Sequence, residues 1–461
     1  MPRGLEACLG RLIIIGTPRG GDQMFRGMRK ALAAGIVAAL LATTALAAGC
    51  ATGPESSPSA ETPAAPSPSL AQYSAQFPLQ CETIQQTRVN AKGILIGHTV
   101  ENLQEICEAP TVRNQNGDPV YDKDGNVQYL EAAYDPETDH YDIDKLSDAQ
   151  LEEMNLKSGC VSCKTTRFND IYAQQGAAAF GNVYNAEARA IVDNDYFDCA
   201  MCHDGEPSAK NLAPQLMFFP AIGGDFVARL DPKNAVCGQC HNAYDYRSSI
   251  HTEEDLQTID AFRNGYDVDG LFETCWEDGV NFETDPATGI TESYVLHPTV
   301  ELFMDTKMQE LGVTCVDCHM PQSTAEDGTT FTNHFSANSP LESEDSLTYC
   351  LNCHERQGIA STEDMAAFVR AQEAELAEGM AALEKREAAF KKALEQAVAK
   401  TGADDPALDD VKKLYAKVTW YDMCLATGPS ESPGSQAAML DWRDILKKAH
   451  AACDEGMAAL A

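Results

Sequence analysis

The segment GCVSCKTTR, residues 159–167, contains two cysteines three positions apart, Cys160 and Cys163, followed directly by Lys164. The same Cys-x-x-Cys spacing recurs four times downstream, as CAMCH, CGQCH, CVDCH and CLNCH, and each of these copies ends in histidine. Ten of the seventeen cysteines lie in the five pairs. So many regularly spaced cysteines in a chain of 461 residues indicate a metal or cofactor role.

Cys-x-x-Cys-His is the covalent attachment signal of c-type haem, in which two thioethers fix the porphyrin and the histidine binds the iron. Zinc ribbons and disulfide-exchange motifs share the cysteine spacing, but neither needs a histidine at the fifth position. We therefore predict haem c at the four histidine motifs, and a relay of electrons between haems that must lie close together. The predicted iron ligands are His203, His241, His319 and His354. The attachment cysteines of all five motifs are Cys160, Cys163, Cys199, Cys202, Cys237, Cys240, Cys315, Cys318, Cys350 and Cys353.

The lysine motif has two interpretations. It is either a redox or zinc Cys-x-x-Cys pair that happens to precede Lys164, or a fifth haem site with an amine as the iron ligand. An amine binds iron only when it is deprotonated, so its usual pKa of about 10.4 must fall through burial and through the charge of the iron. We favour the fifth haem because four haem motifs follow, and we expect that haem to have a different task.

The N-terminal stretch MFRGMRKALAAGIVAALLATTALAAGC, residues 24–50, has the basic start, apolar run and small residues of an export signal. It resembles a bacterial lipoprotein signal, which is cleaved before a cysteine, here Cys50, whose thiol then receives a diacylglycerol. The alternative is ordinary cleavage to a soluble exported protein. We expect residues 1–49 to be the signal with an upstream start extension, and residues 50–72 to be the anchor cysteine and a Pro/Ser/Ala tether.

The charge balance restricts the partners. The chain has 70 acidic and 34 basic side chains and a formal net charge of −36, which excludes nucleic acid as a partner.

The C-terminal sequence is typical of long helices. Ser361 is a capping residue, and apolar residues then recur every seven positions, from Val369 to Ala397. Further helices are expected at residues 406–426 and 435–460. Residues 361–461 are therefore expected to form long C-terminal helices, after a loop-rich multihaem segment at residues 73–360 that contains all five motifs. An earlier stretch, residues 116–129, predicts a surface hairpin.

One Cys-x-x-Cys-Lys motif followed by four Cys-x-x-Cys-His motifs, in an exported chain with a helical C-terminal segment, resembles pentahaem cytochrome c nitrite reductase, the ammonia-forming family. The resemblance implies a mainly α fold, with a loop-rich multihaem cytochrome c core followed by long C-terminal helices, and five haem c groups. It also implies that the haem of Lys164 keeps one face open for nitrite, and that the other haems pass it electrons from a quinol-linked or cytochrome donor. It further implies a homodimer formed through the C-terminal helices. The expected location is the periplasm, or the outer face of the bacterial cytoplasmic membrane with a lipid anchor.

The resemblance extends to residues around the haems. Tyr244, three positions after His241, and His297, eighteen before Cys315, match the catalytic tyrosine and histidine of the family, groups that can donate hydrogen bonds and protons to a bound substrate. The family's second axial ligands fall on His98, His334 and Met308. Met308 is assigned to the haem of His354, where a thioether would raise the reduction potential.

Some family positions differ in this chain. Ile106 stands where the family has a substrate-binding arginine, which Arg113 could replace. Three further substitutions count against calcium near the active site, because the family's calcium ligands are replaced by Ala243, Tyr294 and Leu296. No second ligand is found at the expected place for the haem of His319, for which His450 and Met423 are weaker candidates. His140 and His251 are expected at the surface.

The predicted function is the six-electron reduction of nitrite to ammonia. Two alternatives remain: an electron-transfer lipoprotein that serves a partner reductase, and a paralogue that reduces hydroxylamine or sulfite. Outside the haem motifs, Cys424 could pair with Cys453 and Cys81 with Cys107, which would leave Cys275 unpaired.

Overall fold

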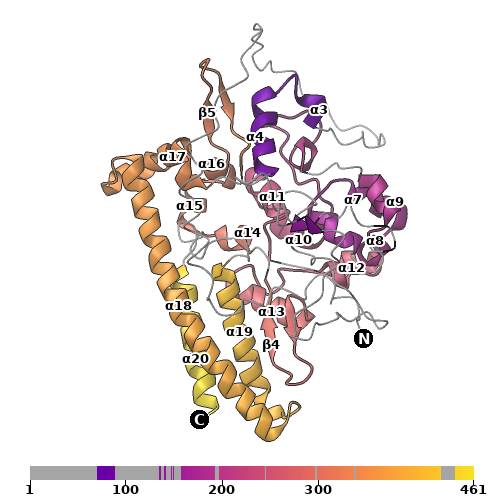
Figure 1. The fold of residues 1–461 in the computed structure, drawn as a ribbon, viewed down its shortest axis with the longest axis vertical. Coiled ribbons are helices and arrows are strands. Elements are labelled where there is room, and N and C mark those ends of the chain that lie inside the picture. The colour runs from indigo at the N-terminus through magenta and orange to yellow at the C-terminus, as the bar shows by residue number, and fades with distance from the viewer. Residues whose placement is uncertain are drawn as a thin grey trace. The chain divides into compact units, whose positions relative to one another are not determined.

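Helices dominate the computed structural model of the chain, which confirms the mainly α prediction (Figure 1). The structure describes residues 70–88, 134–135, 140–141, 147, 149, 157–192, 197–243, 246–295, 298–336, 339–426 and 442–461. The helices are α3 (Leu70–Tyr73), α4 (Pro78–Arg88), α7 (Phe168–Gln175), α8 (Ala178–Gly181), α9 (Ala186–Val192), α10 (Phe218–Ala228), α11 (Pro232–Gly238), α12 (Glu253–Thr258), α13 (Val268–Asp278), α14 (Thr299–Phe303), α15 (Lys307–Glu310), α16 (Cys315–His319), α17 (Glu344–His354), α18 (Thr362–Thr401), α19 (Asp409–Ala426) and α20 (Trp442–Ala459).

Within the described part of the chain, the strands form three short antiparallel hairpins. They are β1 (Tyr134–Asp135) with β2 (His140–Tyr141), β3 (Phe282–Thr284) with β4 (Thr291–Ser293), and β5 (Gln322–Thr324) with β6 (Thr330–Thr332). Short 3₁₀ helices complete the described part: η4 (Ser158–Cys163), η5 (Cys199–Met201), η6 (Arg247–Ser249), η7 (Pro340–Glu342), η8 (Glu355–Gln357) and η9 (Pro406–Leu408). Most haem motifs therefore lie on short helical turns joined by loops.

The predicted helix start at Ser361 is confirmed. Its hydroxyl caps α18 by accepting a hydrogen bond from the backbone N–H of Asp364 at 3.0 Å. Helix α18 then runs as one rod of 40 residues, with α19 and α20 beside it (Figure 1).

The apolar residues that recur every seven positions in α18 pack against other helices of the same chain. Val369, Leu376, Leu383 and Phe390 are buried, and α18 packs on both α19 and α20. The ring of Phe390 meets Tyr415 of α19 edge to face, with centroids 5.4 Å apart. This edge therefore forms the interior of a three-helix bundle and is not available to a second copy of the chain.

Asp269, in the first turn of α13, ties that helix to the C-terminal bundle. Its carboxylate lies 3.0 Å from Lys417 Nζ of α19 and 3.0 Å from Lys448 Nζ of α20, and it accepts a 2.5 Å hydrogen bond from the hydroxyl of Tyr421. Burial raises the pKa of Asp269, but these three partners outweigh it and lower the pKa to about 2.

The proposed pairing of Cys424 with Cys453 is wrong. Both side chains are free thiols, almost completely buried on α19 and α20, where they pack as small apolar groups. The thiol of Cys275 on α13 is also free and buried, as expected.

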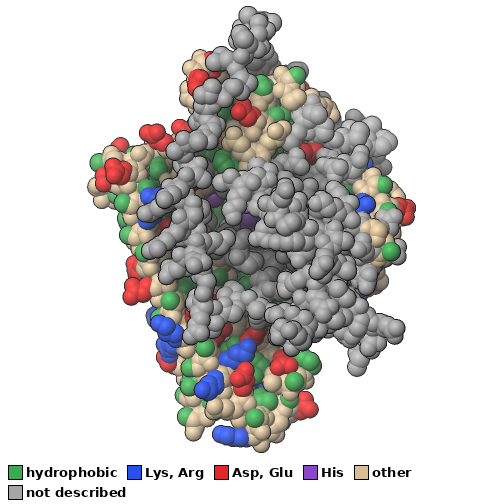
Figure 2. Space-filling view, in the orientation of Figure 1, with side chains coloured by type: hydrophobic (Ala, Val, Ile, Leu, Met, Phe, Trp, Pro, Cys, Tyr) green, Lys and Arg blue, Asp and Glu red, His purple; other side chains and the backbone are tan. Residues whose placement is uncertain are grey.

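Several predictions lie outside the described residues. They concern the export signal and Cys50, His98, Ile106, Cys107, Arg113, the hairpin at residues 116–129, Tyr244, Leu296 and His297. Among the described residues, no helix combines the length and the apolar character needed to cross a membrane. On the face shown in Figure 2, acidic and basic side chains are interspersed over the described surface, as expected for a solvated surface.

Gly456 of α20 lies directly against the ring of Phe390, and a Cβ there would overlap the ring atoms. We expect Gly456→Ala to lower the free energy of unfolding by about 1–3 kcal/mol, because the buried ring cannot move aside. Gly379→Ala is the matched control, since its Cβ would meet only the flexible end of Leu446 and the substitution improves helix propensity. Urea unfolding of the two variants checks this, and equal losses would contradict it.

The ion pairs of Asp269 predict a pH effect. A carboxyl group whose pKa is lowered in the folded state stabilises the protein above the unfolded pKa, near 3.8, and loses this contribution as the pH falls toward the folded value of about 2. Because the site is partly exposed, we expect Asp269→Asn to cost about 1–2 kcal/mol at pH 7 and less as the pH falls from about 4 toward 2. Asp444→Asn removes only a contact within α20 to the same Lys448 and should cost less. Urea unfolding at several pH values tests the comparison.

Candidate haem and active site

Each haem motif is folded as a single helical turn. In CAMCH and CGQCH, the N–H of the histidine donates to the carbonyl of the first cysteine, at 3.0 Å for His203 and 2.9 Å for His241. The CVDCH motif is helix α16 itself, and CLNCH is the last part of α17. Since residues three and four apart lie on one face of a helix, such a turn directs both thiols and the imidazole to the same side. This is the arrangement that covalent haem requires.

The lysine motif forms η4, in which the N–H of Lys164 donates to the carbonyl of Val161 at 2.9 Å. A carbon at Cβ of Gly159 would meet the backbone of Phe180 at 2.7 Å, so only glycine permits this close approach of α8. Glycine before the first cysteine therefore lets the lysine motif pack directly against α8.

The motifs lie against one another in a defined order. The thiol of Cys240 donates to the carbonyl of Cys163 at 3.1 Å, which joins the third motif to the lysine motif. Burial raises the pKa of Cys240. The nearby thiols of Cys163 and Cys202 raise this pKa further, and Lys164 lowers it, so these four side chains are neighbours. The third motif thus lies beside both the first and the second.

The fourth motif continues this order. The pKa of Cys315 is raised first by its hydrogen bond with Cys237, and burial raises the pKa of Cys318 to about 12 with a further contribution from Cys350. Asn234 of α11 accepts the N–H of Cys315 at 2.9 Å. The motifs therefore form one connected series, in which the third touches the first, second and fourth, and the fourth touches the fifth.

Three of the predicted haem histidines have the ring orientation of metal ligands. Nδ1 lies 3.0 Å from the carbonyl of Ser208 in His203, 3.2 Å from that of Ser336 in His319, and 2.9 Å from that of Thr332 in His334. A carbonyl only accepts, so Nδ1 of His319 and of His334 carries the proton and Nε2 keeps its lone pair. Nδ1 of His203 also lies 3.3 Å from the backbone nitrogen of Ser208, so the carbonyl is not its sole hydrogen-bond partner. Burial lowers the pKa of all three imidazoles, which favours the neutral form that binds iron. These residues therefore fit haem.

His334 lies near His203. Burial lowers the pKa of His334, the carbonyl of Thr332 opposes the shift, and repulsion from a charged His203 lowers it further. The two imidazoles, 131 positions apart in the sequence, are thus brought near each other by the fold. The remaining ligand assignments stay predictions. Met308 is half-buried on α15, and the ring of His354 lies 5.8 Å from Phe368.

Two threonines of α4 hold this region, and the sequence interpretation did not include them. Thr83 accepts the N–H of His334 at 2.9 Å, and Thr87 donates to the carbonyl of His334 at 2.7 Å while accepting the N–H of Ser336 at 2.9 Å. Ser336 in turn holds His319. The only signal was the spacing of four residues, which puts both hydroxyls on one face of a helix.

The segments next to the predicted catalytic residues are joined by hydrogen bonds. Val300, three residues after His297, donates its N–H to the carbonyl of His241 at 3.0 Å. Oε1 of Glu301 accepts the N–H of Ala243, the residue before Tyr244, at 2.9 Å. The chain leading into Tyr244 and the chain leaving His297 therefore lie side by side, in contact with the third haem motif.

The C-terminal bundle supports the segment that enters His297. Thr419 of α19 accepts the N–H of Ser293 at 2.9 Å, and Tyr415 donates to Glu292 of β4 at 2.8 Å. Lys391 of α18 also pairs with Glu292 at 2.6 Å. His251, in contrast, is exposed, as predicted. His450 lies on α20 beside Arg386 and Asp454.

Calcium does not fit the described residues of its predicted site. Ala243 offers only a methyl group, and its backbone N–H and C=O are both bound by protein groups. Tyr294 is buried, and a phenol is not a usual calcium ligand. Calcium requires six to eight oxygen ligands. Among the residues that the structure describes, no group of acidic, histidine or cysteine side chains forms a metal site of this kind.

Comparisons with known proteins agree with these features. The sequence profile of the cytochrome c552 family matches residues 136–457. Cytochrome c-552 of Haemophilus influenzae is 26% identical over 255 residues, and that of Haemophilus ducreyi is 26% identical over 239 residues. Each match covers 49% of this chain and 44% of the relative, so the chain spans less than half the length of the curated relatives it matches.

A solved structure has the same fold. Cytochrome c nitrite reductase from Desulfovibrio desulfuricans, a protein with two calcium sites, superimposes with a TM-score of 0.58 at 16% identity, over 85% of this chain and 86% of that one. The family profile covers well over half of the sequence and includes all five motifs. The chain therefore belongs to the cytochrome c552 family, whose members bind haem c.

Proposed function

We propose that the protein is an exported multihaem reductase that converts nitrite to ammonia at the iron held by Cys160, Cys163 and Lys164. The observation that carries the proposal is the series of contacts around the third haem motif. Cys240 touches the lysine motif, and His241 touches the segment that follows His297. The third motif thus links the proposed reaction centre to the proposed catalytic residues.

The order of the motifs supports a route for electrons. Contacts lead from the fifth motif to the fourth, from the fourth to the third, and from the third to the lysine motif, while the second motif joins at the third. When bound, the haems supply one-electron carriers and an iron that binds nitrite. We propose that electrons from either branch converge on the motif of His241 before they reach the reaction centre.

The proposed role of the protein at the reaction centre is to supply protons and orientation. Reduction of nitrite to ammonium consumes six electrons and eight protons. An imidazole at position 297 and a phenol at position 244 can each donate a hydrogen bond and a proton to a substrate oxygen. The contacts of Ala243 with Glu301 and of His241 with Val300 support a common site for the two groups.

We also propose a periplasmic location with a lipid anchor at Cys50, and a quinol-linked or cytochrome electron donor. These proposals rest on the export signal and on the resemblance to the family. A homodimer is proposed on the resemblance alone, since the apolar edge of α18 is covered by α19 and α20.

The decisive experiment measures the open iron and the product together. We expect the EPR spectrum of the haem-loaded protein to contain one high-spin ferric signal that changes with nitrite or cyanide, and we expect ammonia as the product with a viologen donor. His297→Ala should lower kcat for nitrite by about 10²- to 10⁴-fold with unchanged haem content. The exposed His251→Ala is the matched control and should not change kcat.

Other outcomes favour the alternatives. Six-coordinate iron at every haem, with no response to added ligands, would support an electron-transfer lipoprotein that serves a partner reductase. An open iron without ammonia formation from nitrite would indicate another acceptor, such as hydroxylamine or sulfite. Ile106, at the position of the family's arginine, is the sequence feature that motivates this second outcome.

We propose that His334 is the second ligand of the haem of His203, because the two imidazoles lie near each other, and this predicts a separate spectroscopic effect. Removing the imidazole in His334→Ala should leave one haem with a single protein ligand and convert one low-spin signal into a high-spin signal. Thr83→Val, which removes the acceptor for the N–H of His334, should weaken the same signal without abolishing it. EPR of the oxidised protein reports both, and an unchanged low-spin population in His334→Ala would exclude His334 as a ligand.

A further inference from the structure

The peptide groups of Ala243 are held on both sides by buried side chains. Its N–H donates to Oε1 of Glu301 at 2.9 Å, and its carbonyl accepts a hydrogen bond from the amide of Asn281. Ala243 is 1% exposed, Glu301 1% and Asn281 0%. The residue before Tyr244 is thus fixed by two side chains from different parts of the sequence, and neither of them appeared among the predicted site residues.

Glu301 is an unusual residue for this position. Burial raises its pKa to about 8, although the N–H of Ala243 opposes the shift, so the carboxyl group is mostly neutral at pH 7. No described residue forms a hydrogen bond with its Oε2, which is also buried. Because burying an unsatisfied carboxyl oxygen costs stability, a purely structural role would be served better by an apolar side chain.

Asn281 meets a conformational and a chemical requirement at once. Its φ of 63° lies in the left-handed region, which asparagine tolerates better than most residues. Its carbonyl accepts the N–H of Tyr294 at 3.0 Å, and Tyr294 belongs to the segment that leads to His297. Asn281 therefore contacts the chain entering His297 as well as the chain entering Tyr244.

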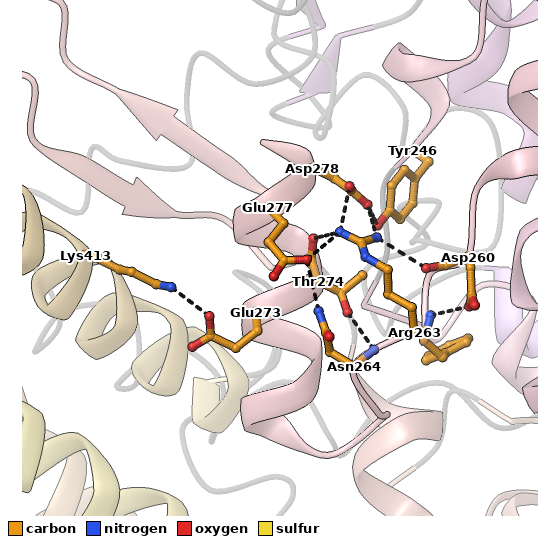
Figure 3. Close-up of polar contacts among 10 residues, drawn as sticks. Tyr246, Asp260, Arg263, Asn264, Glu273, Thr274, Glu277, Asp278 and Lys413 are labelled. Atoms are coloured by element: carbon orange, nitrogen blue, oxygen red, sulfur yellow. Dashed lines mark hydrogen bonds and ion pairs between the residues drawn. The ribbon is translucent and has the colours of Figure 1, made fainter.

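The chain is anchored again directly after Tyr244 and Asp245. The buried Tyr246 donates its hydroxyl to Asp278 at 2.6 Å. Asp278 is held by a two-pronged pair with Arg263, with N···O distances of 2.6 and 2.8 Å (Figure 3). Such pairs fix the geometry of both partners. Ala243 and Tyr246 are therefore fixed points on either side of Tyr244.

We propose that Glu301 and Asn281 are positioning residues, which set the Tyr244 segment against the His297 segment without a divalent cation. The inference rests on the proposed function, because it assigns Tyr244 and His297 to one reaction. An arrangement held by Glu301 and Asn281 differs from a calcium-dependent arrangement in a testable way. Protein groups occupy both the N–H and the C=O of Ala243, and that residue has no side-chain oxygen for a cation.

The test compares substitutions that keep or remove each hydrogen bond, in the haem-loaded protein. Glu301→Gln retains an oxygen that accepts the N–H of Ala243, whereas Glu301→Leu removes it at similar volume. Asn281→Asp keeps a residue suited to positive φ but removes the N–H donor. We expect Glu301→Leu and Asn281→Asp to lower kcat for nitrite at least about tenfold with little change in KM, and Glu301→Gln to retain most of the activity.

Calcium dependence is measured on the wild-type protein at the same time. Neither EGTA nor micromolar calcium should change kcat or Tm. A loss of kcat or Tm in EGTA that calcium restores would overturn the proposal, as would full activity in both Glu301→Leu and Asn281→Asp. If Glu301→Leu does not fold, the kcat of Asn281→Asp for nitrite still tests the proposal. If the wild-type protein does not reduce nitrite, the proposed function fails, while the response of Tm to EGTA and calcium still reports on the cation.

Discussion

The packing of short helical turns against one another is the constraint on which the described structure depends. In a haem c motif two thiols and an iron ligand must leave one turn on the same side, and the proposed function requires the turns to lie close enough to pass electrons. The hydrogen bond from Cys240 to the carbonyl of Cys163, and the cap that Asn234 provides for α16, show how directly the turns contact each other. Several motifs lie on short helices or single turns joined by loops, whereas the fifth forms the last part of α17.

The C-terminal helices have a role beyond their own packing. Asp269 connects them to α13, and Thr419, Tyr415 and Lys391 connect them to β4, which precedes the predicted catalytic histidine. A similar support acts on the other side of the core, where Thr83 and Thr87 hold the residues around His334. Long helices on one side and one N-terminal helix on the other thus fix segments that are irregular in themselves.

Local sequence patterns predicted the structural features that depend on residues close together in the sequence. The cap at Ser361 and the apolar period of α18 are set by residues within a few positions of each other, and the structure confirms both. The partner of the α18 edge was not predictable in this way. An apolar stripe shows that a helix is covered, but it does not show whether α19, α20 or a second chain covers it.

Interactions over long sequence distances account for the rest. Thr83 and His334 are 251 residues apart, and Glu301 and Ala243 are 58 apart, so no motif links them. An isolated threonine or glutamate is common in any sequence, and only burial and hydrogen bonding show its role. Cys424 and Cys453 show the reverse error. Two cysteines on neighbouring predicted helices suggested a disulfide bond, but both thiols are free in the structure.

The central claim is that one iron is bound by Lys164 and is open on its other face. A crystal structure of the haem-loaded protein, grown with nitrite, tests it most directly. The account predicts a porphyrin joined to Cys160 and Cys163, with Nζ of Lys164 on one side of the iron and nitrite or water on the other. A protein side chain on both sides of that iron, or no porphyrin at this motif, would contradict it.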